Sequence, residues 1–170
     1  MIPLMERRII VMRHAKSSWS SPARSDHERP LNKRGQRDAP RVGAALAARG
    51  WLPDLVLSSD SQRTRETFAG LTEGFSSEPR VEFLRSFYGA GPSEVAGELA
   101  SAPQHQSCIL VLGHNPGWEA VAYALCGKPI VMKTATAVLL SRESASWNLS
   151  LIHISEPTRL WSGSRMPSSA

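Results

Sequence analysis

The chain has 170 residues and a formal net charge of +5, and 41% of its residues are hydrophobic while 21% are charged. This composition excludes wholesale disorder, and a chain of this length can bury one sizeable core, so we expect a single domain. The positive charge favours anionic partners. We do not expect nucleic acid among them, because no block of five Lys and Arg residues occurs and no aromatic residues are interleaved with basic ones.

The N-terminal region and the two cysteines bear on the location of the protein. Only four apolar residues, 9–12, directly precede Arg13, which is too few for a secretory signal or a membrane span, and no other apolar run is long enough. Cys108 and Cys126 belong to neither a Cys-x-x-Cys motif nor a Cys/His cluster, so we expect buried free thiols in a reducing compartment. These features predict a cytoplasmic protein with no membrane partner.

Short apolar runs alternate with longer helix-like segments along the chain, a pattern typical of a layered α/β domain. We therefore expect an α/β fold with a mostly parallel central sheet flanked by helices. The predicted strands are 8–13, 55–58, 81–83, 108–112 and 135–141, and the predicted helices are 35–49, 61–71, 93–100 and 117–125.

Several residues mark the ends of these helices. Pro40 interrupts the first one, which predicts either a start near Asp38 as the N-cap or a bend at the proline. Ser59 and Gln62 have the spacing of a capping box for the second helix. Pro116 precedes the last helix and Gly127 fits its C-terminal stop.

The first predicted strand ends at Arg13-His14, and residues 15–32, rich in Ser, Pro and charge, predict a long loop of a kind that often carries function. Sites in open α/β sheets form beyond the carboxyl ends of strands, so this dipeptide lies where chemistry is expected. We interpret His27 in the loop and His105 before a later strand as ordinary surface residues. No convincing cluster of metal ligands occurs, and we expect no metal and no other cofactor.

Two further strand ends carry basic residues. Arg63 falls in the first turn of the second predicted helix, where free backbone N–H groups and a guanidinium together suit phosphate oxygens, whereas we expect Arg65 to lie on the surface. Gly113 permits a close backbone approach, and His114 follows it at the end of the fourth strand. Three strand ends thus predict a phosphate cradle with a nucleophile.

Arg13-His14, the segment SSDSQRTRET and the segment GHNPG occur in this order on this strand pattern. They resemble the Arg-His pair, the Ser-x-x-x-Arg-x-x-x-Thr element and the second histidine of the histidine phosphatase superfamily. The segments RHAKSSW, DHERPLNKRGQRDAP and LVLGHNPGW are similar to the SixA-type phosphohistidine phosphatases in particular. The resemblance spans residues 8 to about 127 and implies a phosphoglycerate-mutase-like fold.

The resemblance implies that His14 is the nucleophile and that Arg13, Arg63 and His114 bind the phosphoryl oxygens. The chemistry of the side chains agrees with these roles. An imidazole with a pKa of about 6.5 is largely neutral at pH 7 and has a lone pair for in-line attack on phosphorus. Two guanidiniums and a histidine N–H would stabilise the charge that gathers on the equatorial oxygens.

The chain departs from the wider superfamily at one place. The mutase-like members carry a Leu-x-Glu element after the third strand, whose carboxylate protonates the leaving oxygen, and Ser86 stands at the corresponding position here. Glu82, Tyr88 or Asp26 could replace that acid, and the spacing does not select among them.

These features predict a metal-independent phosphatase that forms a phosphohistidine intermediate and acts on phosphohistidine in a protein. The alternatives are a small-molecule phosphomonoesterase or mutase-like enzyme, and a non-catalytic phosphate- or RNA-binding module. The expected partner is accordingly a phosphorylated protein or a small phosphorylated substrate.

The predicted phosphatase domain covers residues 1–150, and 151–170 form an irregular tail in which a short apolar run gives way to Ser, Pro and Arg. The segments SLIHISEPTRL and SRMPSSA resemble translated sequencing-adapter read-through, which makes the tail a candidate non-native extension.

Overall fold

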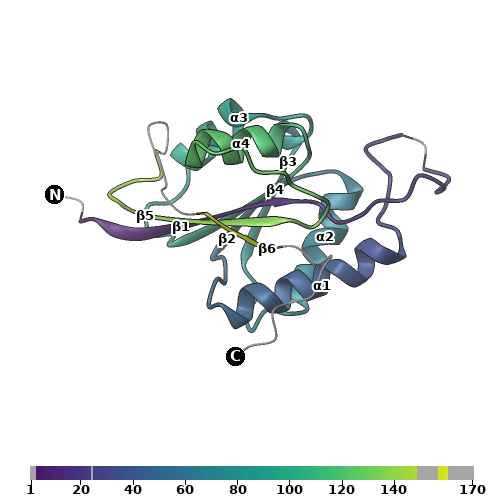
Figure 1. The fold of residues 1–170 in the computed structure, drawn as a ribbon, viewed down its shortest axis with the longest axis horizontal. Helices are drawn as coiled ribbons and strands as arrows, with labels where there is room; N and C mark the ends of the chain where they lie inside the picture. Colours follow the sequence, from purple (N-terminus) through teal and green to yellow (C-terminus); the bar gives the residue numbers. More distant parts are fainter. Residues whose placement is uncertain (1–2, 24, 149–156, 161–170) are drawn as a thin grey trace.

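A computed structural model describes residues 3–23, 25–148 and 157–160, and over these residues a six-stranded sheet lies between two layers of helices (Figure 1). The strands are β1 Met5–Arg13, β2 Leu55–Ser59, β3 Arg80–Leu84, β4 Cys108–Gly113, β5 Ala137–Ser144 and β6 Thr158–Leu160. The α-helices are α1 Lys33–Ala48, α2 Gln62–Thr72, α3 Pro92–Ala100 and α4 Gly117–Cys126, and a single 3₁₀ turn, η1, covers Arg85–Phe87.

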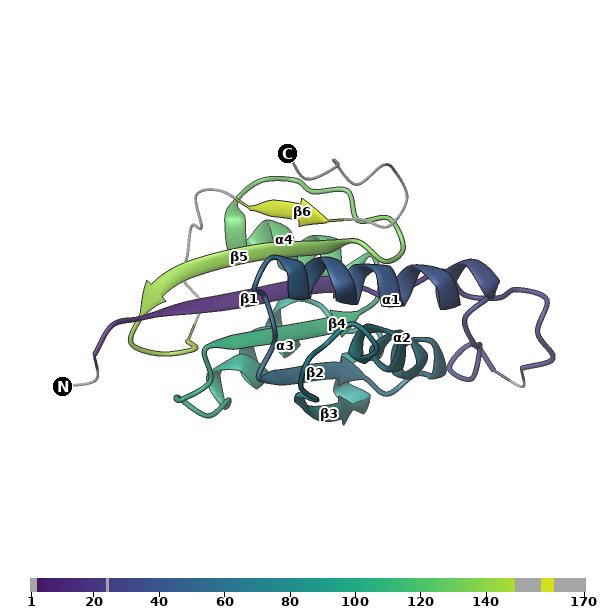
Figure 2. The ribbon, with the colours of Figure 1, turned by 90° about the horizontal axis from the view of Figure 1, so that it is seen from below.

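The strand order across the sheet is β3-β2-β4-β1-β5-β6, which can be followed from edge to edge in Figure 2. Neighbouring strands from β3 to β1 are parallel, and β5 runs antiparallel to both β1 and β6. The register places Arg13 opposite Gly113 and Ser58 opposite Leu112, so β1, β4 and β2 end at the same edge. This mostly parallel sheet confirms the predicted fold class.

Both faces of the sheet are buried, which explains why its central strands are continuous apolar runs. Successive side chains of a strand point to opposite faces. Ile9 and Val11 of β1 therefore pack in the core under α3 and α4, while Ile10 and Met12 pack in the core under α1 and α2. The sheet is thereby held on both sides, and its carboxyl edge is a rigid base for side chains.

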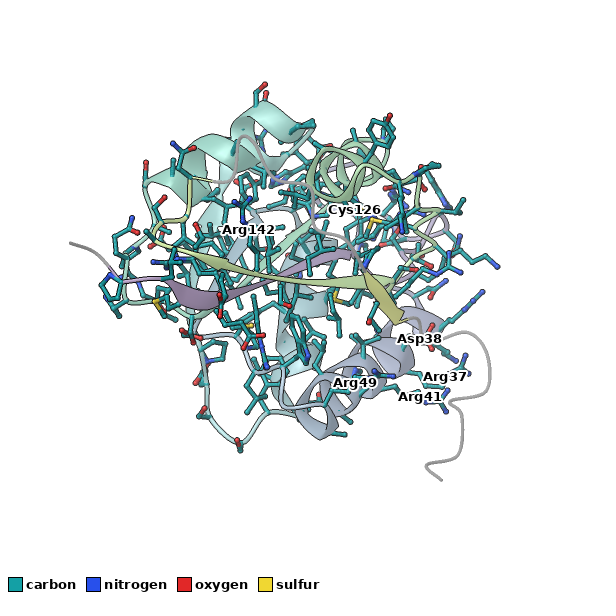
Figure 3. All side chains as sticks on the ribbon, turned by 60° about the vertical axis from the view of Figure 1, so that its left-hand side comes forward. Arg37, Asp38, Arg41, Arg49, Cys126 and Arg142 are labelled. Atoms are coloured by element: carbon teal, nitrogen blue, oxygen red, sulfur yellow. The ribbon has the colours of Figure 1, made fainter. Side chains whose placement is uncertain are left out.

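Helix α1 corrects the predicted start near Asp38. It begins at Lys33, because the side chain of Asn32 accepts a hydrogen bond from the Gly35 N–H at 2.9 Å, and Pro40 lies inside the helix. The helix packs closely on α2, since a Cβ built on Gly43 would lie only 2.2 Å from the carbonyl oxygen of α2's Leu71. The outer side of α1 is basic, with Arg37, Arg41 and Arg49 exposed (Figure 3).

Helix α2 also begins differently from the prediction. Ser59 is the last residue of β2, and the N-cap is Ser61, whose side chain accepts a hydrogen bond from the Thr64 N–H. The predicted ends of α4 are confirmed: Pro116 precedes it, and Gly127 terminates it with a φ of 70°. Cys108 and Cys126 are buried free thiols, as predicted.

The end of the described chain adds a strand that the sequence did not predict. The tail 151–170 was expected to be irregular, but Thr158–Leu160 pairs with β5 as β6, because β5 otherwise offers an open edge. Residues 151–156 and 161–170 lie outside the described residues. No helix within the described ranges is long and apolar enough to cross a membrane.

Candidate active site

His14 is the first residue after β1, and backbone hydrogen bonds from two neighbouring segments hold it. Its N–H donates to the carbonyl of Gly113 at the end of β4, at 3.0 Å, and its carbonyl accepts from the Ala135 N–H at 2.9 Å. The next residue, Ala15, donates its N–H to Oγ1 of Thr67 on α2. Two elements, β4 and α2, and the turn before β5 thus fix the backbone that carries the imidazole.

The protonation of the His14 ring follows from its surroundings. Its Nδ1 lies 2.7 Å from the backbone carbonyl of Ala15, and since a carbonyl can only accept, Nδ1 carries the proton. Burial lowers the pKa of His14 from 6.5 to about 3, and the neighbouring Arg63 and Arg13 charges add to the decrease. The ring is therefore neutral at pH 7, with its lone pair on Nε2.

His114 lies beside His14 as the sequence predicts, with ring centroids 5.1 Å apart. Its Nε2 is 2.8 Å from Oγ of Ser59, and the Tyr88 ring packs against it in a T-shaped arrangement. Burial lowers the pKa of His114 to about 4, with Arg63 adding to the decrease. The close approach at Gly113 is made by a side chain, and not by backbone as the sequence had suggested, because a Cβ there would lie 2.5 Å from the ring of Trp118.

Arg13 and Arg63 reach the same site from β1 and α2. Arg13 donates from one terminal nitrogen to the carbonyl of Met132 at 2.9 Å. Arg63 is 5% exposed and donates to the backbone carbonyl of Asp26 at 2.7 Å and to its carboxylate at 3.0 Å. Arg65 is exposed, which confirms the predicted register of the helix.

Three nitrogens of these side chains share an unusual property: within the described residues each is buried and has no hydrogen-bond partner. They are Nε of Arg13, Nε of Arg63 and Nδ1 of His114. Buried polar atoms are normally paired, and unpaired ones call for an explanation. All three belong to the side chains predicted to bind phosphoryl oxygens, and each is a nitrogen from which a bound anion could accept a hydrogen bond.

The loop between β1 and α1, which extends past the end of β1 in Figure 1, supplies the acidic side of the site. Asp26 accepts a hydrogen bond from the Tyr88 hydroxyl at 2.6 Å in addition to its bonds from Arg63. The bond from Tyr88 is the largest cause that lowers the pKa of Asp26 to about 2, while the same contact raises the pKa of Tyr88. Asp26 is therefore an ionised partner of Arg63 and holds no proton to give at pH 7.

The third candidate acid, Glu82, has a different partner. Glu82 pairs with Arg80 on β3 at 2.7 Å, and Ser86 is exposed on η1. Of the three predicted replacements for the missing acid, only Asp26 and Tyr88 lie at the site.

The interpretation of His27 as an ordinary surface residue was wrong. Its Nε2 lies 2.8 Å from the Asp60 carboxylate, its ring meets the edge of Tyr88, and its carbonyl accepts the Gln62 N–H at the start of α2. His105 is exposed, as predicted. Ser59 and Thr67 also lie at the site, and both belong to the Ser-x-x-x-Arg-x-x-x-Thr element, but the sequence indicated no functional role for Thr67 and only a helix cap for Ser59.

A cavity of about 200 Å³ opens beside His114. It is lined by residues 89–91 and 114–117. In the part of the chain that the structure describes, no three His, Cys, Asp or Glu side chains are grouped so that they could hold a metal ion.

The comparison with known sequences identifies the chain. Residues 9–84 match the histidine phosphatase superfamily (branch 1). An uncharacterized chloroplastic protein of Arabidopsis thaliana is 41% identical over 155 residues, which cover 84% of this chain and 70% of the relative. The chain belongs to the histidine phosphatase superfamily. It is therefore a phosphatase.

Solved structures place this histidine phosphatase in the SixA-type branch. A candidate phosphohistidine phosphatase SixA from Nakamurella multipartitia is 29% identical, with a TM-score of 0.75 and coverage of 92% of this chain and 97% of that one. A second SixA candidate, from Agrobacterium tumefaciens, is also 29% identical, with a TM-score of 0.71 and coverage of 81% and 94%. The predicted family and branch are confirmed.

Proposed function

We propose that this histidine phosphatase hydrolyses phosphohistidine in a protein substrate, with His14 as the nucleophile and Arg13, Arg63 and His114 as the phosphoryl-binding residues. One observation carries the proposal. A neutral imidazole with its lone pair on Nε2 lies among three buried nitrogens that have no partner within the described residues. A nucleophile and donors for the equatorial oxygens are the two requirements of phosphoryl transfer.

In the first step, Nε2 of His14 attacks phosphorus and forms a P–N bond while the bond from phosphorus to the substrate's imidazole nitrogen breaks. The Ala15 carbonyl, which accepts from Nδ1–H at 2.7 Å, supports the positive charge that the ring gains. The guanidiniums of Arg13 and Arg63 offset the negative charge on the transferred oxygens. Both charges are in place before the reaction, so little reorganisation is required.

In the second step, water attacks phosphorus and the P–Nε2 bond breaks, which releases inorganic phosphate and restores His14. The leaving imidazole of His14 again has its Nδ1–H held by Ala15. Because burial keeps the pKa of His14 near 3, the free ring leaves as a neutral group and is ready for another cycle at pH 7.

The state of the acidic residues supports phosphohistidine over a phosphate ester. Expelling a serine alkoxide requires a proton donor, and general acid help is worth roughly 100- to 10,000-fold. Asp26 has a pKa of about 2 and Ser86 takes the position of the superfamily's acid. A phosphohistidine needs less help, because its imidazole has a pKa near 6.5 and takes its proton from water at neutral pH.

The test compares kcat/KM on a phosphohistidine peptide and on a phosphoserine peptide of like charge. We expect the phosphohistidine peptide to be favoured by at least about 100-fold, the lower end of the effect of a general acid. Equal kcat/KM values on the two peptides would contradict the inference that the site lacks a general acid for ester substrates.

A small phosphorylated molecule is the second candidate substrate. The cavity of about 200 Å³ beside His114 favours it, because a compact leaving group could occupy that space. Turnover of small phosphate esters at rates that match the phosphohistidine peptide would support this candidate.

A further inference from the structure

Ser59 lies directly behind His114. Its Oγ is 2.8 Å from Nε2 of His114, and the serine is fully buried while the histidine is 9% exposed. Ser59 occupies the last position of β2, so the same sheet edge that presents the site also fixes this hydroxyl. No role follows for it from the family's chemistry described above.

The direction of this hydrogen bond follows from the partners that Ser59 has. A buried hydroxyl needs an acceptor for its proton. Within the described residues, Oγ of Ser59 has two partners: the Ser61 N–H at 3.3 Å, which can only donate, and Nε2 of His114. The Ser59 proton is therefore directed to Nε2.

A second hydroxyl, that of Ser61, lies farther from His114 and has other partners. Its Oγ is 3.5 Å from Nε2 of His114 but only 2.8 Å from Oγ1 of Thr64, and it also accepts the Thr64 N–H. Oγ1 of Thr64 in turn donates to the Ser59 carbonyl at 2.7 Å, so it can accept the Ser61 proton. The Ser61 hydroxyl therefore has hydrogen-bond partners without His114, and of the two serines only Ser59 has to donate its proton to Nε2.

A neutral imidazole has one N–H, and burial keeps His114 neutral at pH 7. With Nε2 accepting from Ser59, the proton of His114 is on Nδ1, the nitrogen that is buried without a partner among the described residues. The opposite tautomer would turn a lone pair toward the phosphoryl oxygens, which repel it.

We propose that Ser59 is a positioning residue that holds His114 as its Nδ1–H tautomer, so that Nδ1–H donates to a phosphoryl oxygen of the substrate. The inference rests on the proposed function for the role of the donated bond. The tautomer itself is a property of the free enzyme, and it can be measured without any substrate.

The test is ¹⁵N NMR of the histidine side chains in the free enzyme at pH 7, with kcat measured on an aryl phosphate. The wild type should give a protonated Nδ1 and an unprotonated Nε2 on His114. Ser59→Ala should shift His114 toward the Nε2–H tautomer and lower kcat by roughly 10- to 100-fold, somewhat less than the loss of a whole donor. Ser59→Thr, which keeps the hydroxyl, should restore the wild-type tautomer.

Ser61→Ala is the matched control. It removes the N-cap of α2 and should lower the midpoint of thermal unfolding, but the Nδ1–H tautomer should remain. If Ser59→Ala does not fold, Ser59→Cys, whose thiol is a weak donor, replaces it with the same expected shift.

An unchanged Nδ1–H tautomer in the Ser59→Ala variant, or in Ser59→Cys where that variant replaces it, would overturn the proposal, and so would an Nε2–H tautomer in the wild type. A wild type with the expected tautomer but no phosphatase turnover would instead count against the proposed function alone.

Discussion

The site has two halves that are held in place in different ways. The strand-end half, Arg13, His14 and His114, follows directly from β1 and β4, and the backbone of His14 is bonded to residues 113 and 135. The loop half, Asp26, His27 and Tyr88, is joined by side-chain contacts between distant segments, and half of the Asp26 side chain is exposed. Arg63 bridges the halves. The proposed nucleophile, His14, thus belongs to the strand-end half, while Asp26 of the loop half holds Arg63.

Removal of the bridging side chain should have the largest effect. We expect Arg63→Ala to lower kcat by roughly 100- to 1,000-fold, as is typical for the loss of one preorganised donor. Arg65→Ala, two residues along the same helix but exposed, should change kcat little. The measurement is steady-state kinetics on an aryl phosphate, with thermal melts to confirm folding. Equal losses in the two variants would contradict the assigned orientation of α2.

The strand-end half should make stability depend on pH. His14 and His114 have folded pKa values of about 3 and about 4, below the unfolded value near 6.5, so as the pH falls the unfolded chain takes up protons first. The contribution of the two neutral histidines to the free energy of unfolding is therefore fully present above pH 6.5, and it is lost progressively as the pH falls toward 4 to 3. At pH 5 each histidine should lower the free energy of unfolding by about 2 kcal/mol relative to its value at pH 7.5.

Urea unfolding at pH 7.5 and pH 5 measures this loss. His14→Asn is the control, and its loss between the two pH values should be smaller than that of the wild type by about 2 kcal/mol. The same pH dependence in both proteins would show that His14 is not held neutral by burial.

The contact between α4 and the segment after η1 should tolerate no added atom. A Cβ built on Gly117, the first residue of α4, would lie 1.8 Å from the carbonyl oxygen of Ala90, so Gly117→Ala should destabilise the protein by about 1 to 3 kcal/mol. Gly97→Ala, on the exposed side of α3 with open space around it, should instead stabilise by up to about 1 kcal/mol. Urea unfolding distinguishes the two, and two variants of equal stability would contradict this packing.

The smallest effect is expected in the loop half. Tyr88→Phe keeps the ring against His114 but removes the hydroxyl that donates to Asp26, so kcat should fall by much less than the roughly 100-fold typical of a lost general acid. The pKa of Asp26 should rise toward its ordinary value, because the Tyr88 bond is the main cause of its decrease. Kinetics and an NMR titration of Asp26 measure both changes. A 100-fold loss of kcat would make Tyr88 the missing acid.

The sequence predicted the strand-end half because its signals are local. Apolar runs end at Arg13 and at Gly113, and parallel strands that end together must bring the following histidines to one edge. Arg63 could be distinguished from Arg65 by its place in the first turn of a helix. The family resemblance then supplied roles for these residues.

The sequence offered Asp26 and Tyr88 as candidate acids, but the contacts of the loop half could not be predicted because they join residues far apart in the chain. Asp26 and Tyr88 are 62 positions apart, and nothing in the spacing of either residue indicates the other. His27 was misread for the same reason, since its partner Asp60 follows the next strand. The N-cap of α1 at Asn32 was missed because Pro40 suggested a later start, whereas the helix continues through the proline and packs closely on α2.

The central claim is that His14 carries the phosphoryl group during turnover. Rapid quench with ³²P-labelled phosphohistidine peptide should leave an acid-labile, alkali-stable phosphate on the wild-type protein, and peptide mapping should place it on His14. His14→Ala should carry no label. Label that persists on the His14→Ala variant, or wild-type turnover with no labelled protein at any quench time, would contradict the account.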